Sequence, residues 1–360
     1  MAAATTTRVN SMSEEESPAL GAVRILRDAA GVRTTYEEIE IGRDLGTELW
    51  MPTQAQIDQV CERMEDHHPY YEVGSPFGST VVPVSMTYLL TRALFSQTYS
   101  VRGLFYKWSV DLLEPIRPGV TYTVQGKISD KWVRNDREFV AYESECRDPS
   151  GTPVFRTRRA HVLDFIKRTA PKVGEGGLGT SDARSPAARE ARQPYWDPDW
   201  PADDTAAGTG SIEALPLADR STQPGARLPS NALYFSQSKF IARQNNYFVG
   251  RGPTLHHDAR AAQQEGLPAP VASAPDLMAL CHQSAMQFFG AGWIRGGRAE
   301  LTSMRPTYVG EYVVSQGVVT ALEEQPDGSL RLECDVWVVN QHGERKVAGK
   351  ISGLVPTGAQ

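Results

Sequence analysis

Alternation of apolar and polar positions recurs in two stretches of the chain. In both stretches, β-branched and aromatic residues alternate with polar ones over short runs that end at turn residues such as Gly119 and Gly310. This period of two between turns predicts antiparallel strands. The predicted strands cover residues 104–110, 121–124, 139–142 and 154–157 in the first stretch, and residues 298–301, 312–314, 330–337 and 346–349 in the second.

An apolar helical segment precedes each set of strands. The two segments, residues 83–95 and residues 275–289, are apolar on most faces, which is typical of a helix that a sheet buries. A shorter helix is expected over residues 53–60, where Thr53 is a suitable N-terminal cap. One helix wrapped by a curved antiparallel sheet, made twice, predicts an α+β fold of the tandem double hot-dog type.

The two predicted half-domains are interpreted as copies of one structural unit. Pro115 and Gly119 in the first copy have the same spacing as Pro306 and Gly310 in the second, which is a weak internal repeat. Neither half could bury all of its apolar surface alone. If the two halves share one continuous sheet, each covers the surface that the other leaves exposed. The repeat therefore supports two halves of one fold.

Two segments without a periodic apolar pattern set the predicted domain boundaries. Residues 1–33 begin with a small, polar and acidic stretch, which indicates a flexible N-terminal tail and not a secretory signal. Residues 169–227 are rich in Gly, Ala, Pro, Ser and Asp, which indicates a linker. The N-terminal hot-dog half is then residues 34–168 and the C-terminal hot-dog half is residues 228–356.

Composition narrows the class of protein further. The 360 residues are 40% hydrophobic with a formal net charge of -6, and no run of about 18 apolar residues is present. The four cysteines are scattered without a CxxC pair, which favours free thiols in a reducing compartment. The basic run at residues 156–159 is too short for a nucleic-acid interface. We therefore expect a cytoplasmic protein with neither a membrane nor a nucleic acid as its partner.

The segment that leads into the second apolar helix carries the candidate chemistry. It contains Gly-Arg-Gly-Pro-Thr-Leu-His-His-Asp at residues 250–258 and Pro-Val-Ala-Ser-Ala at residues 270–274. This segment resembles the MaoC-like (R)-specific enoyl hydratase/dehydratase family. Members of that family carry an Asp-x-Asn-Pro-x-His loop, then an acidic residue, a short helix to Gly, and Pro-Ile-Ala-His-Gly at the central helix. Five residues fall on this motif without a gap: His256, Asp258, Gly266, Pro270 and Ala272.

The resemblance implies a hydro-lyase, that is, a hydratase or dehydratase, acting on an acyl thioester or a related unsaturated carbonyl compound. Such a reaction needs a base for water, an acid for the α-carbon, and donors for the enolate oxygen. In the family, an Asp and a His on the loop hold the water, and a backbone N–H at the start of the central helix receives the thioester oxygen. His256 is thereby the candidate general acid/base. The candidate substrate-binding residues are Arg251, Gly266, Pro270, Ala272, Ser273 and Ala274.

The sequence departs from the family at the catalytic Asp. Arg251 stands in that position, and an always-charged guanidinium cannot act as a base. The first half carries a fainter trace of the motif in which Asp66 and Pro69 fit, but Tyr71 replaces the His. Neither half therefore contains the complete pair.

Three interpretations remain open. A substitute carboxylate, with Asp66, Asp258 and Asp276 as candidates, would preserve the family's reaction. In the second interpretation, the same fold catalyses a different reaction, as a decarboxylase, isomerase or cyclase in which Arg251 binds an anionic group. The third interpretation is a non-catalytic acyl-binding partner subunit, in which His256 is a loop histidine satisfied by the backbone.

Other expectations concern cofactors and partners. No cofactor and no metal ion are expected, since adjacent histidines such as His67 and His68 rarely chelate one ion together. His282, on an apolar helix, is interpreted as a packed core histidine, and His257 as structural. The expected partner is a small-molecule or acyl-thioester substrate, and the exposed edges of such sheets favour a homodimer.

Overall fold

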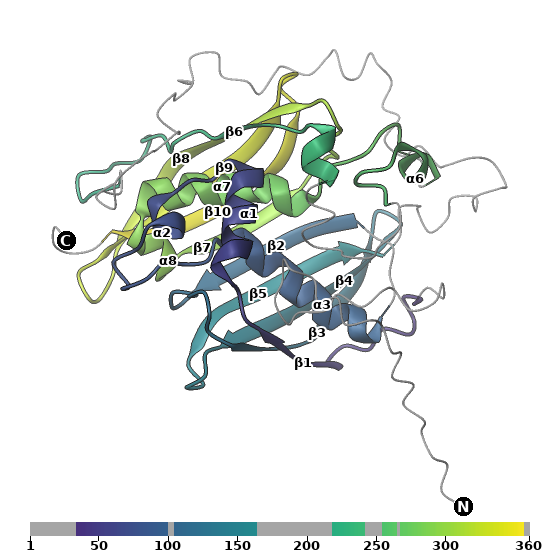
Figure 1. Ribbon diagram of the computed structural model, residues 1–360, viewed down its shortest axis with the longest axis horizontal. Helices are drawn as coiled ribbons and strands as arrows, with labels where there is room; N and C mark the ends of the chain where they lie inside the picture. The colour runs from purple at the N-terminus through teal and green to yellow at the C-terminus, as the bar shows by residue number, and fades with distance from the viewer. Residues whose placement is uncertain (1–33, 100–103, 164–217, 242–253, 265–266, 356–360) are drawn as a thin grey trace, which may run out of the picture.

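The computed structural model describes residues 34–99, 104–163, 218–241, 254–264 and 267–355. Two halves lie side by side, the first coloured purple to teal and the second green to yellow in Figure 1. Each half has a long helix packed on a curved antiparallel sheet, which confirms the predicted α+β double hot-dog fold. The predicted tail lies wholly outside the described residues and the predicted linker largely so, and the domain boundaries therefore stay a prediction.

The two halves share one ten-stranded antiparallel sheet with the order β1-β3-β4-β5-β2-β7-β10-β9-β8-β6. The halves join where β2 pairs with β7, for example at Trp108 opposite Leu301. The strands of the first half are β1 (Asp44–Trp50), β2 (Leu104–Leu112), β3 (Tyr122–Arg134), β4 (Arg137–Arg147) and β5 (Pro153–Val162). The strands of the second half are β6 (Ala232–Tyr234), β7 (Arg298–Ser303), β8 (Tyr312–Glu324), β9 (Leu330–Asn340) and β10 (Arg345–Val355).

Both predicted central helices are present. In the first half a 3-10 turn, η2 (Val84–Thr87), precedes α3 (Tyr88–Thr98), and in the second half α7 spans Ala274–Phe289. The expected early helix is α1 (Gln54–Met64), with Thr53 as its cap in a capping box. Three shorter helices of the described residues are α2 (Pro69–Glu72), α6 (Ala259–Gln264) and α8 (Ala291–Ile294).

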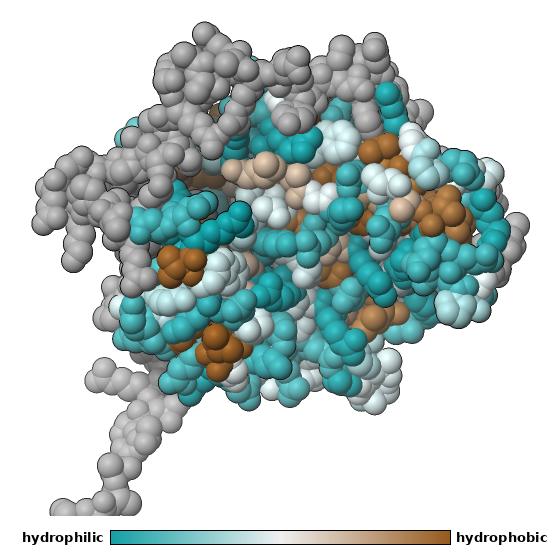
Figure 2. Space-filling view, turned by 180° about the vertical axis from the view of Figure 1, so that it is seen from behind, coloured by the Kyte–Doolittle hydropathy of each residue, from teal (hydrophilic) through white to brown (hydrophobic). Residues whose placement is uncertain are grey.

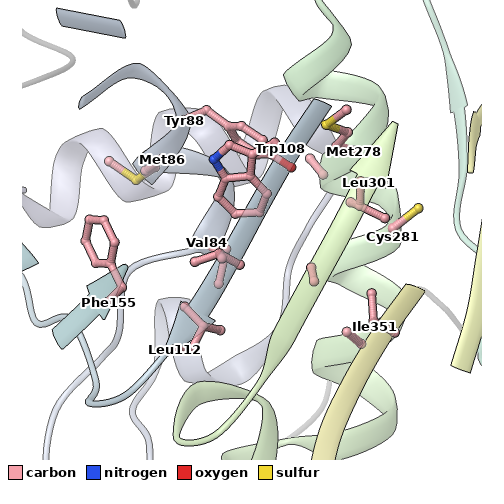
Figure 3. Close-up of a cluster of buried hydrophobic side chains, with 14 of the residues drawn as sticks. Val84, Met86, Tyr88, Trp108, Leu112, Phe155, Met278, Cys281, Leu301 and Ile351 are labelled. Atoms are coloured by element: carbon pink, nitrogen blue, oxygen red, sulfur yellow. The ribbon is translucent and has the colours of Figure 1, made fainter. Parts of the chain in front are cut away.

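The core is continuous across the junction of the halves. Figure 3 shows Tyr88 and Trp108 of the first half beside Met278 and Leu301 of the second. The Tyr88 hydroxyl lies 2.6 Å from Nε2 of His282, so a hydrogen bond links the two central helices inside this core. Burial lowers the pKa of His282 to about 3, which keeps the ring neutral. His282 is therefore the packed core histidine that its apolar helix predicts.

The surface and the cysteines agree with the composition. The face seen from behind in Figure 2 is mostly hydrophilic, with scattered hydrophobic side chains. None of the helices in the described ranges is long and apolar enough to cross a lipid bilayer. All four cysteines are buried and unpaired, as expected for free thiols. They are Cys61, Cys146, Cys281 and Cys334.

Candidate functional site

His256 is held beside the segment that leads into α7. Its ring is partly buried, and Nδ1 lies 2.8 Å from the carbonyl oxygen of Val271. A carbonyl oxygen only accepts hydrogen bonds, so Nδ1 carries the proton and donates it. In the neutral ring the lone pair is then on Nε2. The backbone thus fixes the tautomer and leaves Nε2 as the basic nitrogen.

Backbone hydrogen bonds fix the position of residues 270–273. The Val271 N–H donates to Leu255, and the Ala272 N–H donates to the Thr307 carbonyl at 2.7 Å. Pro270 and Ala272 are buried, and Ser273 is the N-terminal cap residue of α7, which begins at Ala274, one residue before the expected helical segment. The N-terminus of a helix is the positive end of its dipole, so an anionic oxygen is stabilised at this position. His256 and this helix start are therefore held by the same short segment.

Asp258 has a structural contact of its own. Its Oδ1 accepts the N–H of Ala261 at 2.7 Å, and its carbonyl accepts the N–H of Ala262. These are the contacts of an N-terminal cap on α6. The cap explains why an acidic residue stands at this position, and any catalytic role of Asp258 stays a prediction.

Asp276, the other nearby carboxylate, forms an ion pair with the first half. Its Oδ1 lies 3.0 Å from Nη1 of Arg63, and the two side chains are only 6% and 5% exposed. Asp276 lies in the first turn of α7, and Arg63 lies in the last turn of α1. The carboxylate therefore binds a buried guanidinium that comes from the other half of the fold.

Asp66, in the first-half motif, is a carboxyl group whose pKa lies well above its ordinary value. Burial raises the pKa of Asp66 to about 7, although the charge of His67, the N–H of His68 and the amide of Gln283 act in the opposite direction. Gln283 lies on α7 and also donates to the Met64 carbonyl at 3.0 Å. A pKa near 7 allows a carboxyl group to bind and release a proton at neutral pH.

The rest of the first-half motif forms a compact structural turn. His68 caps α2, and burial lowers the pKa of its ring to about 4. Tyr71, at the position of the family histidine, is 1% exposed, and burial raises the pKa of its hydroxyl well above the ordinary value. Tyr71 therefore stays protonated and cannot replace a histidine as a base at neutral pH.

Two residues near the candidate site, Arg63 and Gln283, form contacts between the halves that the sequence analysis did not predict. Arg63 contacts Asp276, and Gln283 contacts the segment of Asp66, so both contacts join residues that are far apart in the chain. One signal was present: Gln283 is a buried amide on a helix that is apolar on most faces. A polar residue in such a position usually has a specific hydrogen-bond partner.

Two predicted substrate-binding residues cannot be placed. Arg251 and Gly266 lie outside the described residues, so their contribution stays a prediction. Within the described part of the chain, no three or more His, Cys, Asp or Glu side chains are grouped so as to hold a metal ion.

A hollow of about 820 Å³ lies away from His256, on the outer face of the sheet at the junction of the halves. Charged side chains of opposite sign face each other across neighbouring strands in this hollow. Lys127 lies 3.2 Å from Glu143, and Arg156 lies 2.7 Å from Glu145. The lining of the hollow therefore carries charges of both signs.

Asp66 also gives a prediction for the pH dependence of stability. Its pKa is about 7 in the folded protein, whereas an aspartate in an unfolded chain titrates near about 3.9. The folded protein therefore holds a proton that the unfolded chain releases. This stabilisation is present below the unfolded pKa and is lost as the pH rises through the folded pKa.

Between these two pKa values, the free energy of unfolding of the wild type is expected to fall as the pH rises. We expect this fall to be smaller in Asp66→Asn. Urea unfolding at several pH values measures the effect, and Asp335→Asn, an exposed carboxylate on the outer face of the sheet, is the matched control. Equal slopes for the wild type and Asp66→Asn would show that the Asp66 carboxyl has an ordinary pKa.

Comparisons with known proteins agree with this architecture. Neither a protein-family model nor a curated protein sequence matches the chain. A solved MaoC-like dehydratase matches with a TM-score of 0.65 at 16% identity, over 89% of this chain and 99% of its own. The MaoC-like dehydratase of Phytophthora capsici has a TM-score of 0.59 at 13% identity, over 90% and 99% of the two chains. The peroxisomal multifunctional enzyme type 2 of Drosophila melanogaster has a TM-score of 0.52 at 13% identity, over 86% of this chain and 48% of that chain. The chain therefore has the fold of MaoC-like dehydratases.

Proposed function

We propose that the protein is a hydro-lyase of the MaoC-like type that acts on an acyl thioester or a related α,β-unsaturated carbonyl compound. One observation carries the proposal: the His256 ring is fixed by Val271, two residues before the cap of the central helix α7. A base and a helix N-terminus held by one segment supply two of the elements that hydration of a conjugated thioester requires. The shared fold supports the same reaction class.

In the proposed hydration, Nε2 of His256 takes a proton from water as the oxygen attacks the β-carbon. Negative charge then develops on the thioester oxygen, and backbone N–H groups at the start of α7 stabilise it with the help of the helix dipole. The imidazolium returns its proton to the α-carbon, which completes the addition. In this scheme a single histidine serves as base and then as acid, and Arg251 does not have to act as the base.

The experiment is to incubate the protein with crotonyl-CoA and longer enoyl-CoAs and to follow the absorbance of the conjugated thioester. Loss of that absorbance, with formation of the 3-hydroxyacyl product, supports the proposal. Tight binding of an acyl-CoA without turnover would replace it by the acyl-binding alternative. Cytoplasmic location and a homodimer remain expectations from the sequence.

The pKa of Asp66 favours a second candidate function on the same scaffold. Asp66 contacts α7 at Gln283, ten residues beyond the cap Ser273, which is about 15 Å along the helix axis at 1.5 Å per residue. We therefore treat Asp66 and His256 as separate proton-transfer groups. An isomerase, decarboxylase or cyclase that uses Asp66 would lose its activity in Asp66→Asn and keep it in His256→Ala. For the hydro-lyase the opposite is expected: activity is lost in His256→Ala and kept in Asp66→Asn.

A further inference from the structure

A lysine is buried in the second half, where it contacts the carbonyl oxygen of Pro306. Lys346 on β10 is 1% exposed, and its ammonium group has three acceptors. Nζ lies 2.8 Å from Glu311, 3.1 Å from Glu344 and 3.0 Å from the carbonyl oxygen of Pro306. An ammonium group has three N–H donors, so these contacts match its full capacity. A buried charge with complete and specific partners is held in one position.

Glu311 holds the same turn from its other side. Its Oε1 accepts the N–H of Tyr308 at 3.2 Å, while its Oε2 accepts the Asn340 amide at 2.8 Å. Lys346 therefore fixes the carbonyl of Pro306, and Glu311 fixes the N–H of Tyr308. Together the ion pair holds the turn of residues 306–308 at two backbone atoms.

This turn is hydrogen-bonded to the segment that positions His256. The Ala272 N–H donates to the Thr307 carbonyl at 2.7 Å, and Val271 forms a β-bridge with Tyr308. Val271 is also the residue whose carbonyl accepts the His256 Nδ1–H. A continuous set of contacts thus runs from Lys346 through the turn and Val271 to the His256 ring.

We propose that Lys346 and Glu311 are positioning residues for His256. They hold the 306–308 turn, the turn holds Val271, and the Val271 carbonyl keeps the proton on Nδ1 and the lone pair on Nε2. The consequence for catalysis rests on the proposed function, whereas the effect on the His256 tautomer does not. An ion pair that served stability alone would leave the tautomer of the folded protein unchanged.

Lys346→Met tests the proposal, because methionine keeps the unbranched apolar stem and removes the ammonium group. Lys350→Met is the matched control: Lys350 lies on the same strand, pairs with Asp335 at 3.6 Å, and faces the outer side of the sheet. The His256 tautomer is read from ¹⁵N NMR of the neutral ring, with the signal assigned by its absence in His256→Gln. We expect Lys346→Met to populate the Nε2–H tautomer, which predominates in an unconstrained imidazole, and Lys350→Met to resemble the wild type.

Activity gives the second readout. We expect Lys346→Met to lower kcat for enoyl-CoA hydration at least tenfold with KM changed by less than about threefold, because the change misplaces the His256 ring and replaces none of the candidate substrate-binding residues. If Lys346→Met does not fold, Glu311→Gln replaces it, since glutamine keeps the side-chain shape and weakens the hold on Lys346. The same change of tautomer is expected, with a smaller loss of kcat.

The outcomes separate this proposal from the proposed function. A folded variant, Lys346→Met or Glu311→Gln, with wild-type His256 tautomer and kcat overturns the positioning role, even if His256 proves essential. A shifted tautomer in a protein that hydrates no enoyl-CoA supports the positioning role and counts against the hydro-lyase.

Discussion

Replacement of His256 by alanine is expected to lower kcat/KM for hydration of an enoyl-CoA by about 10²–10⁴-fold, the usual contribution of a general acid/base. The change removes the nitrogen that is held as a base by the 2.8 Å hydrogen bond from Nδ1 to the Val271 carbonyl. The measurement is the initial rate of loss of conjugated thioester absorbance at several substrate concentrations. Thermal unfolding of the variant checks that the fold is kept.

The neighbouring histidine provides the matched control. His257 is partly buried like His256, but its Nδ1 lies 3.0 Å from the hydroxyl of Thr254 and its carbonyl accepts the amide of Gln237. His257→Ala is therefore expected to change kcat/KM by no more than a few-fold. Equal losses in the two variants would point to a general disturbance of the loop, and no loss in His256→Ala would end its assignment as the acid/base.

Much of the fold could be predicted because burial repeats with a regular period along most elements. The central helices were found from their apolar faces, and Thr53 was found as a cap from its residue type and position. The predicted strand at residues 121–124 proved to be only the start of β3, which runs to Arg134. Its later part is half-exposed and carries charges such as Lys127, which pairs with Glu143 on β4. Cross-strand ion pairs stabilise this part of the strand, and single-strand patterns do not show them.

The edge strand β1 was missed for a different reason. A register shift between Asp44 and Thr47 interrupts its pairing with β3, so Leu45 and Trp50 are both buried although they are five residues apart. An odd spacing of buried residues hides the period of two on which strand prediction depends. This segment is identified as a strand by its pairing with β3, which the sequence pattern does not show.

The candidate site was predictable in part. The motif predicts His256 near the start of α7, and in the structure the ring contacts Val271, which lies just before this helix, while the roles of these residues stay predictions. The contacts that come from the other half could not be predicted, since nothing in the linear order pairs Arg63 with Asp276 or Asp66 with Gln283. They form only in three dimensions, where the end of α1 and the residues that follow it approach α7.

The buried pair of Arg63 and Asp276 is expected to give the largest effect on stability. Removing one partner of a buried ion pair leaves an uncompensated charge, which costs about 3–5 kcal/mol. Arg63→Met and Asp276→Leu should each lower the free energy of unfolding by about this amount. Because the pair joins α1 of the first half to α7 of the second, either variant should weaken the junction of the halves.

The double variant Arg63→Met/Asp276→Leu is expected to be more stable than either single variant, because it leaves no unpaired charge in the junction. Urea unfolding of the four proteins gives the coupling energy of the pair. The exposed pair of Lys350 and Asp335, 3.6 Å apart on the outer face, is the control and should show a coupling of about 0–1 kcal/mol. Additive losses at the buried pair would mean that Arg63 and Asp276 stabilise the junction through packing and not through their charges.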